Sequence, residues 1–184
     1  MKKVKFLTIS IFAIALFVSC SDDDVPEPVL PQEVITTLEL TLKPIGGGTD
    51  IVLEYRDLDA DGPNPPVITP LGNLVAGTSY NGAILLLNET VDPSENVTEE
   101  VDEEALEHQF FYTIGGDLNV TTEYENFDAD GNPLGTLLML SAGEASSGKL
   151  TLTLRHEPNK PNSGLADAGG ETDIEVTFNV AVVD

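Results

Sequence analysis

Two histidines, each next to a glutamate, are the residues of this chain best suited to holding a metal ion. They form the pairs Glu107-His108 and His156-Glu157, and the chain contains no other His. Imidazole and carboxylate together suit zinc, copper, nickel or iron, so these four residues are the predicted transition-metal ligands. The alternative is that all four are ordinary rim residues in contact with solvent. The relative position of the two imidazoles distinguishes these alternatives. A shared metal site requires both rings to point into the same pocket, whereas rings on opposite faces would exclude it.

Two acidic turns suggest a second kind of site. Each repeats the spacing of the first half of a calcium loop, in which alternate carboxylates surround one ion and a Gly provides the sharp bend. The bidentate Glu expected at the twelfth position is absent from both turns. Weak structural calcium and a plain Asp-Gly hairpin turn therefore remain alternatives. The candidate calcium ligands are Asp57, Asp59, Asp61, Asp128 and Asp130.

The common catalytic motifs are absent from the sequence. There is no Gly-x-Ser-x-Gly elbow, no His-Glu-x-x-His pair and no glycine-rich turn between a strand and a helix. The chain also has no Trp and few aromatic residues, which argues against a platform for stacking sugars. We therefore expect a binding protein and not an enzyme.

The acidic composition restricts the partners. The 184 residues include 8 Lys and Arg against 32 Asp and Glu, which gives a formal net charge of −24 at pH 7. Nucleic acids and anionic lipid surfaces are bound by clusters of Lys and Arg, so the composition excludes both as electrostatic partners.

Alternating apolar residues predict that the body of the chain is β-structure. Thr, Val, Ile and Leu recur at a period of two, which is typical of strands with one solvated face. The clearest segments are 35–42, 149–155 and 173–183, and a helical period is present only near 97–106. Turn residues recur roughly every ten residues, as they do in a sandwich or barrel.

A self-match indicates that a four-strand unit occurs twice. Residues 48–62 lead from a Gly through a strand ending in Glu-Tyr to an Asp-Ala-Asp-Gly turn, and residues 116–131 repeat this order. The two units cover approximately 34–90 and 107–158, and a last strand follows at 173–183. We therefore predict an all-β, immunoglobulin-like sandwich of two antiparallel sheets with about nine strands.

An up-and-down strand order would place the candidate ligands at one end of this sandwich. Strand starts and ends alternate along such a run, so Glu107 and His108 are expected at the same end as His156 and Glu157. The acidic turns are expected there too. So is the connecting loop 89–107, which has nine carboxylates and no Lys or Arg.

The N-terminus has the features of a bacterial lipoprotein signal. A basic start precedes an apolar run of about thirteen residues, which is too short to span a membrane. The run ends at Ser19-Cys20, which resembles a lipobox, where the Cys is acylated and the signal is cut before it. We predict a signal peptide at 1–19 and anchoring to outer-membrane lipid through Cys20. The alternative is an ordinary signal peptide with an incidental Cys.

An acidic, Pro-rich tether is predicted at 20–33, before a single sandwich domain at 34–184. Ser21-Asp22-Asp23-Asp24 resembles the signal that sends some lipoproteins of Gram-negative bacteria to the outer face of the outer membrane. The three Pro of the tether favour an extended spacer. Surface display is therefore preferred, and the periplasmic face remains the alternative.

Several segments together resemble a family of small lipoproteins. They are Cys-Ser-Asp-Asp-Asp, Asp-Leu-Asp-Ala-Asp-Gly-Pro-Asn, Leu-Asn-Glu-Thr, Glu-His-Gln-x-Phe-Tyr, Leu-Arg-His-Glu-Pro-Asn-Lys and Gly-Gly-Glu-Thr-Asp-Ile-Glu-Val. The chain resembles outer-membrane lipoproteins often labelled "type 1 periplasmic binding fold superfamily protein". This resemblance implies a companion of a TonB-dependent receptor and supplies no site residues. The label also implies a two-domain α/β fold, which the all-β pattern does not support.

Two functions from different classes are consistent with these features. The first is a non-enzymatic surface lipoprotein that captures a divalent metal or metal complex for a TonB-dependent receptor, with acidic loops raising the local cation concentration. The second is an acidic interaction module that docks on a membrane partner, with calcium at most stiffening its Asp turns.

Overall fold

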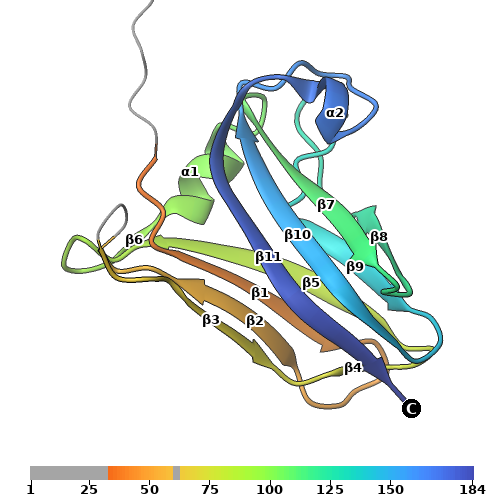
Figure 1. The fold of residues 1–184 in the computed structure, drawn as a ribbon. Helices are drawn as coiled ribbons and strands as arrows, with labels where there is room; N and C mark the ends of the chain where they lie inside the picture. Colours follow the sequence, from red (N-terminus) through yellow and green to blue (C-terminus); the bar gives the residue numbers. More distant parts are fainter. Residues whose placement is uncertain (1–32, 60–62) are drawn as a thin grey trace, which may run out of the picture. The chain divides into compact units, whose positions relative to one another are not determined.

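Two β-sheets face each other in the computed structural model, which describes residues 33–59 and 63–184 (Figure 1). The all-β sandwich expected from the alternating pattern is confirmed. The predicted signal peptide, Cys20 and the tether up to residue 32 lie outside the described residues. Within the described part of the chain, no helix is long and apolar enough to cross a membrane.

The larger sheet has the strand order β3-β2-β1-β5-β9-β8, and β6 pairs with β5 beside this path. Its strands are β1 (Thr37–Pro44), β2 (Ile51–Arg56), β3 (Val67–Leu71), β5 (Ser79–Asn88), β6 (Glu95–Asn96), β8 (Val120–Tyr124) and β9 (Leu137–Ala142). The smaller sheet has the order β4-β11-β10-β7. Its strands are β4 (Leu74–Val75), β7 (His108–Gly116), β10 (Ser146–His156) and β11 (Glu171–Val183). Nine of the described strands contain five or more residues, in agreement with the predicted number.

The core lies between the sheets and is built from alternate apolar residues of each strand. Leu38, Leu40 and Leu42 of β1 are fully buried, and Leu152 and Leu154 of β10 face them from the other sheet. Burying each Leu side chain contributes about 1.5–3 kcal/mol, which is why a period of two in the sequence produces this packing.

Two short helices connect the strands. The first, α1 (Val97–Glu103), covers the segment where a helical period was expected, and Val97 and Val101 bury its apolar face. Asn96 caps it by accepting a hydrogen bond from the backbone N–H of Thr98. The second, α2 (Leu165–Ala168), was not expected from the sequence. Both helices lie near the end of the sandwich where β7 begins (Figure 1).

The two proposed repeat units share only part of their pairing. In the first unit, β1 pairs with β5 and β2 pairs with β3. The second unit has the equivalent pairs, β7 with β10 and β8 with β9. However, β1 and β2 are neighbours, whereas β7 and β8 lie in different sheets. The chain crosses between the sheets after Gly116, close to Gly148. A Cβ on Gly148 would lie 2.4 Å from the carbonyl oxygen of Gly115, so the crossing requires a residue without a side chain there.

A carboxylate ties three strands of the larger sheet together near the end of β5. Glu89 accepts hydrogen bonds from Arg56 Nε at 2.8 Å and Nη2 at 2.6 Å, and from Thr37 Oγ1 at 2.5 Å. The hydrogen bonds from Arg56, followed by that from Thr37, lower the pKa of Glu89 from 4.5 to about 2.

We predict that Glu89→Gln lowers the urea midpoint of unfolding at neutral pH. Because the pKa of Glu89 is depressed in the folded state, its stabilising effect is complete above pH 4.5 and is lost as the pH falls toward about 2. The gap between variant and wild type should therefore shrink over this range. Glu123→Gln, at an exposed carboxylate of β8, is the matched control. A gap that does not change with pH would contradict this account.

Candidate metal centre

The two histidines meet at one end of the smaller sheet. β7 begins at His108 and β10 ends at His156, and the antiparallel register places these two residues directly opposite each other. Their rings stack with centroids 4.7 Å apart and an angle of 22° between the planes. On the same face of the sheet, the next pair of opposite residues is Phe110 and Leu154, and both are buried. The two histidines therefore lie at the end of the core. The expected placement of both histidines at one end holds, but the expected up-and-down order does not, because β7 pairs directly with β10 in a different sheet from β8 and β9.

A third residue, Asp173, reaches the same place from β11, which pairs with the other side of β10. The register shifts by one residue between Leu154 and Arg155, and Asp173 is the extra residue on β11. Strict alternation would place Asp173 on the outer face of the sheet with Glu175. The bulge instead turns its side chain toward the histidines. A bulge leaves no signal in the alternating pattern, so Asp173 was not among the predicted ligands.

The carboxylate of Asp173 is completely buried and lies against both rings. Its Oδ2 is 3.8 Å from His108 Nε2, and its Oδ1 is 3.8 Å from His156 Nδ1. Neither oxygen has a hydrogen-bond partner among the described residues, and the same is true of His108 Nε2. The potential ligand atoms of the three residues all lie within 4.8 Å of one another. Buried polar atoms are nearly always hydrogen-bonded, and most of the described exceptions gather here, the others being Asp57 Oδ1 and Arg155 Nε.

Glu33 adds a second carboxylate to the buried side of the pair. Its Oε1 lies 3.2 Å from His108 Nε2, its side chain is only 9% exposed, and its Oε2 has no hydrogen-bond partner in the described part of the chain. The sequence analysis assigned Glu33 to the last position of the acidic, Pro-rich tether, and the structure places its side chain against His108 at the end of the sandwich.

Glu107 and Glu157, the two predicted carboxylate ligands, lie on the solvent side. Glu107 Oε2 is 4.0 Å from His156 Nε2, and its side chain is half exposed. With Glu157 it forms an exposed grouping around His156 alone. The four predicted residues therefore do not form one cluster. The reason is that neighbours in a strand point to opposite faces, so a glutamate beside an inward-facing histidine points outward.

Hydrogen bonds fix the orientation of His108. Its Nδ1 lies 3.2 Å from the carbonyl oxygen of Glu104, just beyond α1. A donating Nδ1–H leaves the lone pair of Nε2 directed at the carboxylates, which is the usual arrangement for a metal-binding histidine. Lys160 stabilises the same turn. Its Nζ donates hydrogen bonds to the carbonyl oxygens of Ala105 at 2.7 Å and His108 at 2.6 Å, and it pairs with the carboxylate of Asp128 at 3.1 Å.

Both titratable groups at the centre of the cluster have perturbed pKa values. Burial raises the pKa of Asp173 to about 6, against the opposing influence of the two histidines. Burial by itself would lower the pKa of His108, but the Glu33 carboxylate, the Glu104 carbonyl and Asp173 together raise it. Negative charge at this point is therefore costly without a cation.

The second acidic turn is held by internal hydrogen bonds. Asp128 accepts from the backbone N–H groups of Asp130 at 3.0 Å and Asn132 at 2.8 Å, in addition to its pairing with Lys160. In a plain hairpin turn the Asp side chain accepts hydrogen bonds from the backbone in the same way. The contacts therefore favour a hairpin turn over a calcium site for Asp128 and Asp130.

The first acidic turn is only partly described. Asp59 accepts hydrogen bonds from the backbone and side chain of Asn64, and Asp57 is mostly buried with one oxygen unpartnered among the described residues. Asp61 lies outside the described residues. Calcium at this turn therefore stays a prediction.

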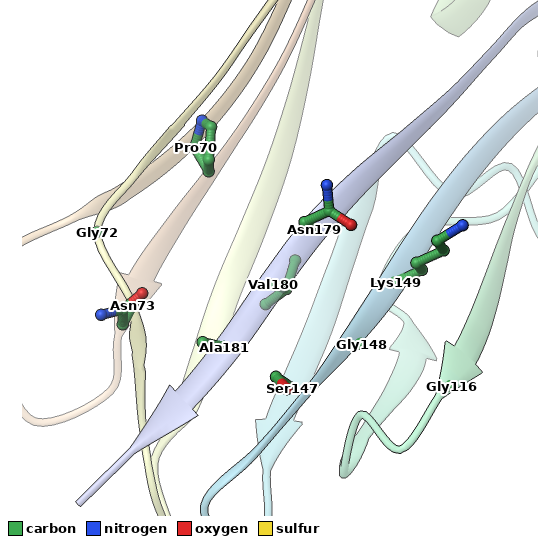
Figure 2. Close-up of a pocket in the computed structure, with 10 residues that line it drawn as sticks. All are labelled: Pro70, Gly72, Asn73, Gly116, Ser147, Gly148, Lys149, Asn179, Val180 and Ala181. Atoms are coloured by element: carbon green, nitrogen blue, oxygen red, sulfur yellow. The ribbon is translucent and has the colours of Figure 1, made fainter.

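A separate hollow lies near the opposite end of β10 and β11. This groove has a volume of about 790 Å³, and its lining includes Lys149 and Asn179. Figure 2 shows the side chains of both residues on neighbouring strands. Its lining includes no His, Asp or Glu. Lys149 is seven residues from His156 along β10, about 23 Å at the rise of a β-strand, so the groove and the histidine cluster are independent features.

Comparison of the chain with protein-family models, with curated proteins and with solved structures found no match. The chemistry of the cluster must therefore be argued from its own residues.

We predict that Asp173→Asn stabilises the metal-free protein at neutral pH. The pKa of Asp173 is raised in the folded state, so its ionisation opposes folding. This penalty is absent below about pH 4 and complete above about pH 6, where the shift corresponds to about 3 kcal/mol. Urea unfolding in the presence of a chelator, at about pH 7.5 and about pH 4, measures the difference.

Asp117→Asn, at an exposed carboxylate just after β7 and at the other end of the sheet, is the control. Lower stability of Asp173→Asn than of wild type at both pH values would show that the carboxylate is satisfied within the fold and needs no cation.

Proposed function

We propose that this protein is a non-enzymatic, lipid-anchored accessory that captures a divalent transition-metal ion with His108, His156 and Asp173. The observation that carries the proposal is the buried carboxylate of Asp173, which faces two imidazoles and has no hydrogen-bond partner among the described residues.

The donor set fits a transition metal better than calcium or magnesium. Calcium and magnesium prefer oxygen ligands, whereas two imidazoles and a carboxylate suit zinc, copper or iron. Bonds of about 2.1 Å in a tetrahedral zinc site place neighbouring donors about 3.4 Å apart. The donors of His108, His156 and Asp173 lie within 4.8 Å of one another, and the two rings are stacked, so binding one ion requires the donors to draw closer and the rings to turn their nitrogens toward it.

The surroundings favour cation capture. α1 carries acidic residues along its exposed side and contains no Lys or Arg, and it leads directly into the strand that begins with His108. The formal charge of −24 adds to this local field. Both effects raise the concentration of cations near the site and speed their association.

The location and the partner belong to the same proposal. The lipobox-like Ser19-Cys20 and the acidic residues after it support anchoring in the outer membrane, with the sandwich at the cell surface. The resemblance to lipoproteins that accompany TonB-dependent receptors supports transfer of the metal to such a receptor. Binding would be reversible coordination, without a chemical step.

Calorimetric titration tests metal capture directly. The full chain, solubilised in detergent and stripped of metal, is titrated with zinc, copper, nickel, iron(II) and calcium. We expect submicromolar binding of at least one transition metal. Asp173→Asn and His156→Asn should each weaken it by more than about 100-fold, because each removes a ligand from the metal. Asp117→Asn removes one negative charge at the other end of the sheet and should leave the affinity nearly unchanged.

Two other outcomes would contradict the proposal. Transition-metal binding that Asp173→Asn and His156→Asn do not affect would place the ion elsewhere, for instance at the exposed glutamates around His156. Millimolar calcium binding alone would support the second function, an acidic docking module stiffened at its first Asp turn.

A further inference from the structure

We propose that the outer face of the larger sheet is a docking surface for a basic, amphipathic α-helix of a partner protein. The outer face is the side turned away from β10 and β11 (Figure 1). This inference goes beyond metal capture and does not depend on it, because the two histidines and Asp173 belong to the smaller sheet.

An apolar strip lies in the middle of this face. A sheet that packs on one side only normally carries polar residues on the other side, and Glu39, Thr41 and Lys43 of β1 follow this rule. The central strands β5 and β9 break it, because the residues between their buried positions are apolar as well. We define the apolar strip as the outward residues Ala83, Leu85, Leu87, Leu137 and Met139.

The residues of the apolar strip are neighbours and are in contact with solvent. Ala83 is directly opposite Leu137, and Leu85 and Leu87 extend the strip along β5. Ala83 and Leu137 are exposed, the latter by 45%, and the other three side chains are partly exposed. Contiguous exposed apolar side chains mark an interaction surface, because burying them against a partner is favourable.

Carboxylates flank the apolar strip on both sides. On the β1 side, Glu39 is directly opposite Leu85, and Glu54 of β2 is directly opposite Glu39. On the β8 side, Glu123 is directly opposite Met139. Like charges in directly opposite positions destabilise a sheet, and no Lys or Arg of the described residues forms an ion pair with Glu39 or Glu54. A cationic side chain from a partner would remove this repulsion.

The basic residues of this face do not neutralise the flanks. Arg56 is already paired with Glu89 at 2.6 Å, and Lys43 lies opposite Asn81 near the end of β1. The formal charge of −24 acts in the same direction. A second copy of the chain or an anionic lipid surface would be repelled, so charge complementarity selects a basic partner.

The spacing of the two acidic flanks fits a helix. β1 and β8 are separated by β5 and β9, which amounts to three strand spacings, or about 14 Å. An α-helix with its side chains is about 10–12 Å across. Such a helix can lie along β5 and β9 with its apolar side on the strip, while Lys or Arg residues on both of its sides reach the flanking carboxylates.

A designed peptide tests this surface. The probe is a fluorescent peptide of about 18 Leu and Lys residues with all Leu on one helical face. The full chain is held in nanodiscs of zwitterionic lipid at about 0.15 M salt, and fluorescence anisotropy measures binding against empty nanodiscs. We expect a dissociation constant on the order of micromolar. A peptide of the same composition in scrambled order, without an apolar helical face, should not bind.

Two variants of the surface locate the binding. Leu137→Thr should weaken it about tenfold or more, because it removes apolar contact at the exposed centre of the strip. Glu54→Lys should weaken it by a similar factor and also raise the urea midpoint of unfolding, because an ion pair with Glu39 replaces two like charges. A damaged fold would lower that midpoint. Val183→Thr and Asp117→Lys, at exposed positions of the smaller sheet and just after β7, are the matched controls and should change the affinity less than about twofold.

Several outcomes would overturn the proposal. Equal losses of affinity in Asp117→Lys and Glu54→Lys would show that overall charge alone attracts the peptide. Binding that Leu137→Thr does not weaken, or no binding to the wild type, would exclude the apolar strip as the docking surface. Dimerisation of the wild type that Leu137→Thr abolishes would assign the face to a second copy. None of these results bears on metal capture, which the calorimetric titration tests separately.

Discussion

One buried carboxylate, that of Asp173, has no hydrogen-bond donor among the residues that the structure describes, and this end of the sandwich is organised around it. Asp173 enters the core from β11 and meets the two imidazoles of β7 and β10, and the neighbouring Glu33 adds further negative charge. A buried charge of this kind must be protonated, paired or bound to a cation. Under the proposed function, a metal ion bound by Asp173 and the two imidazoles would meet this requirement.

The architecture of the second half of the chain serves this arrangement. If β7 and β8 were paired as β1 and β2 are, β7 would be enclosed by neighbours within the larger sheet. The crossing after Gly116 instead leaves β7 in the smaller sheet, where β10 lies between it and β11. Three adjacent strands then place His108, His156 and Asp173 at the same end. Lys160 stabilises that end by binding two carbonyls of the turn before β7 together with Asp128.

The sequence was sufficient to predict the sandwich, the long strands and the placement of His108 and His156 at one end. These features depend on the alternation of apolar residues and of strand direction, which a single sequence displays. The sequence left open whether the two imidazoles meet, and the up-and-down strand order was wrong because β7 pairs with β10. The sequence was insufficient to predict which carboxylates lie beside the histidines. Glu107 and Glu157 are next to the histidines in sequence and for that reason point to the opposite face. Asp173 reaches the site through a bulge, and Glu33 through a contact between the start of the domain and a strand 75 residues later. Neither feature has a local pattern.

Anomalous diffraction from a crystal of the protein soaked in zinc, collected on both sides of the zinc absorption edge, tests the central claim most directly. The account predicts one dominant peak about 2.1 Å from His108 Nε2 and from a ring nitrogen of His156, with an Asp173 oxygen at a similar distance. Refinement would then identify the remaining ligand. A dominant peak at the exposed group of Glu107 and Glu157 or at Asp57 and Asp59, with none between the buried residues, would contradict it.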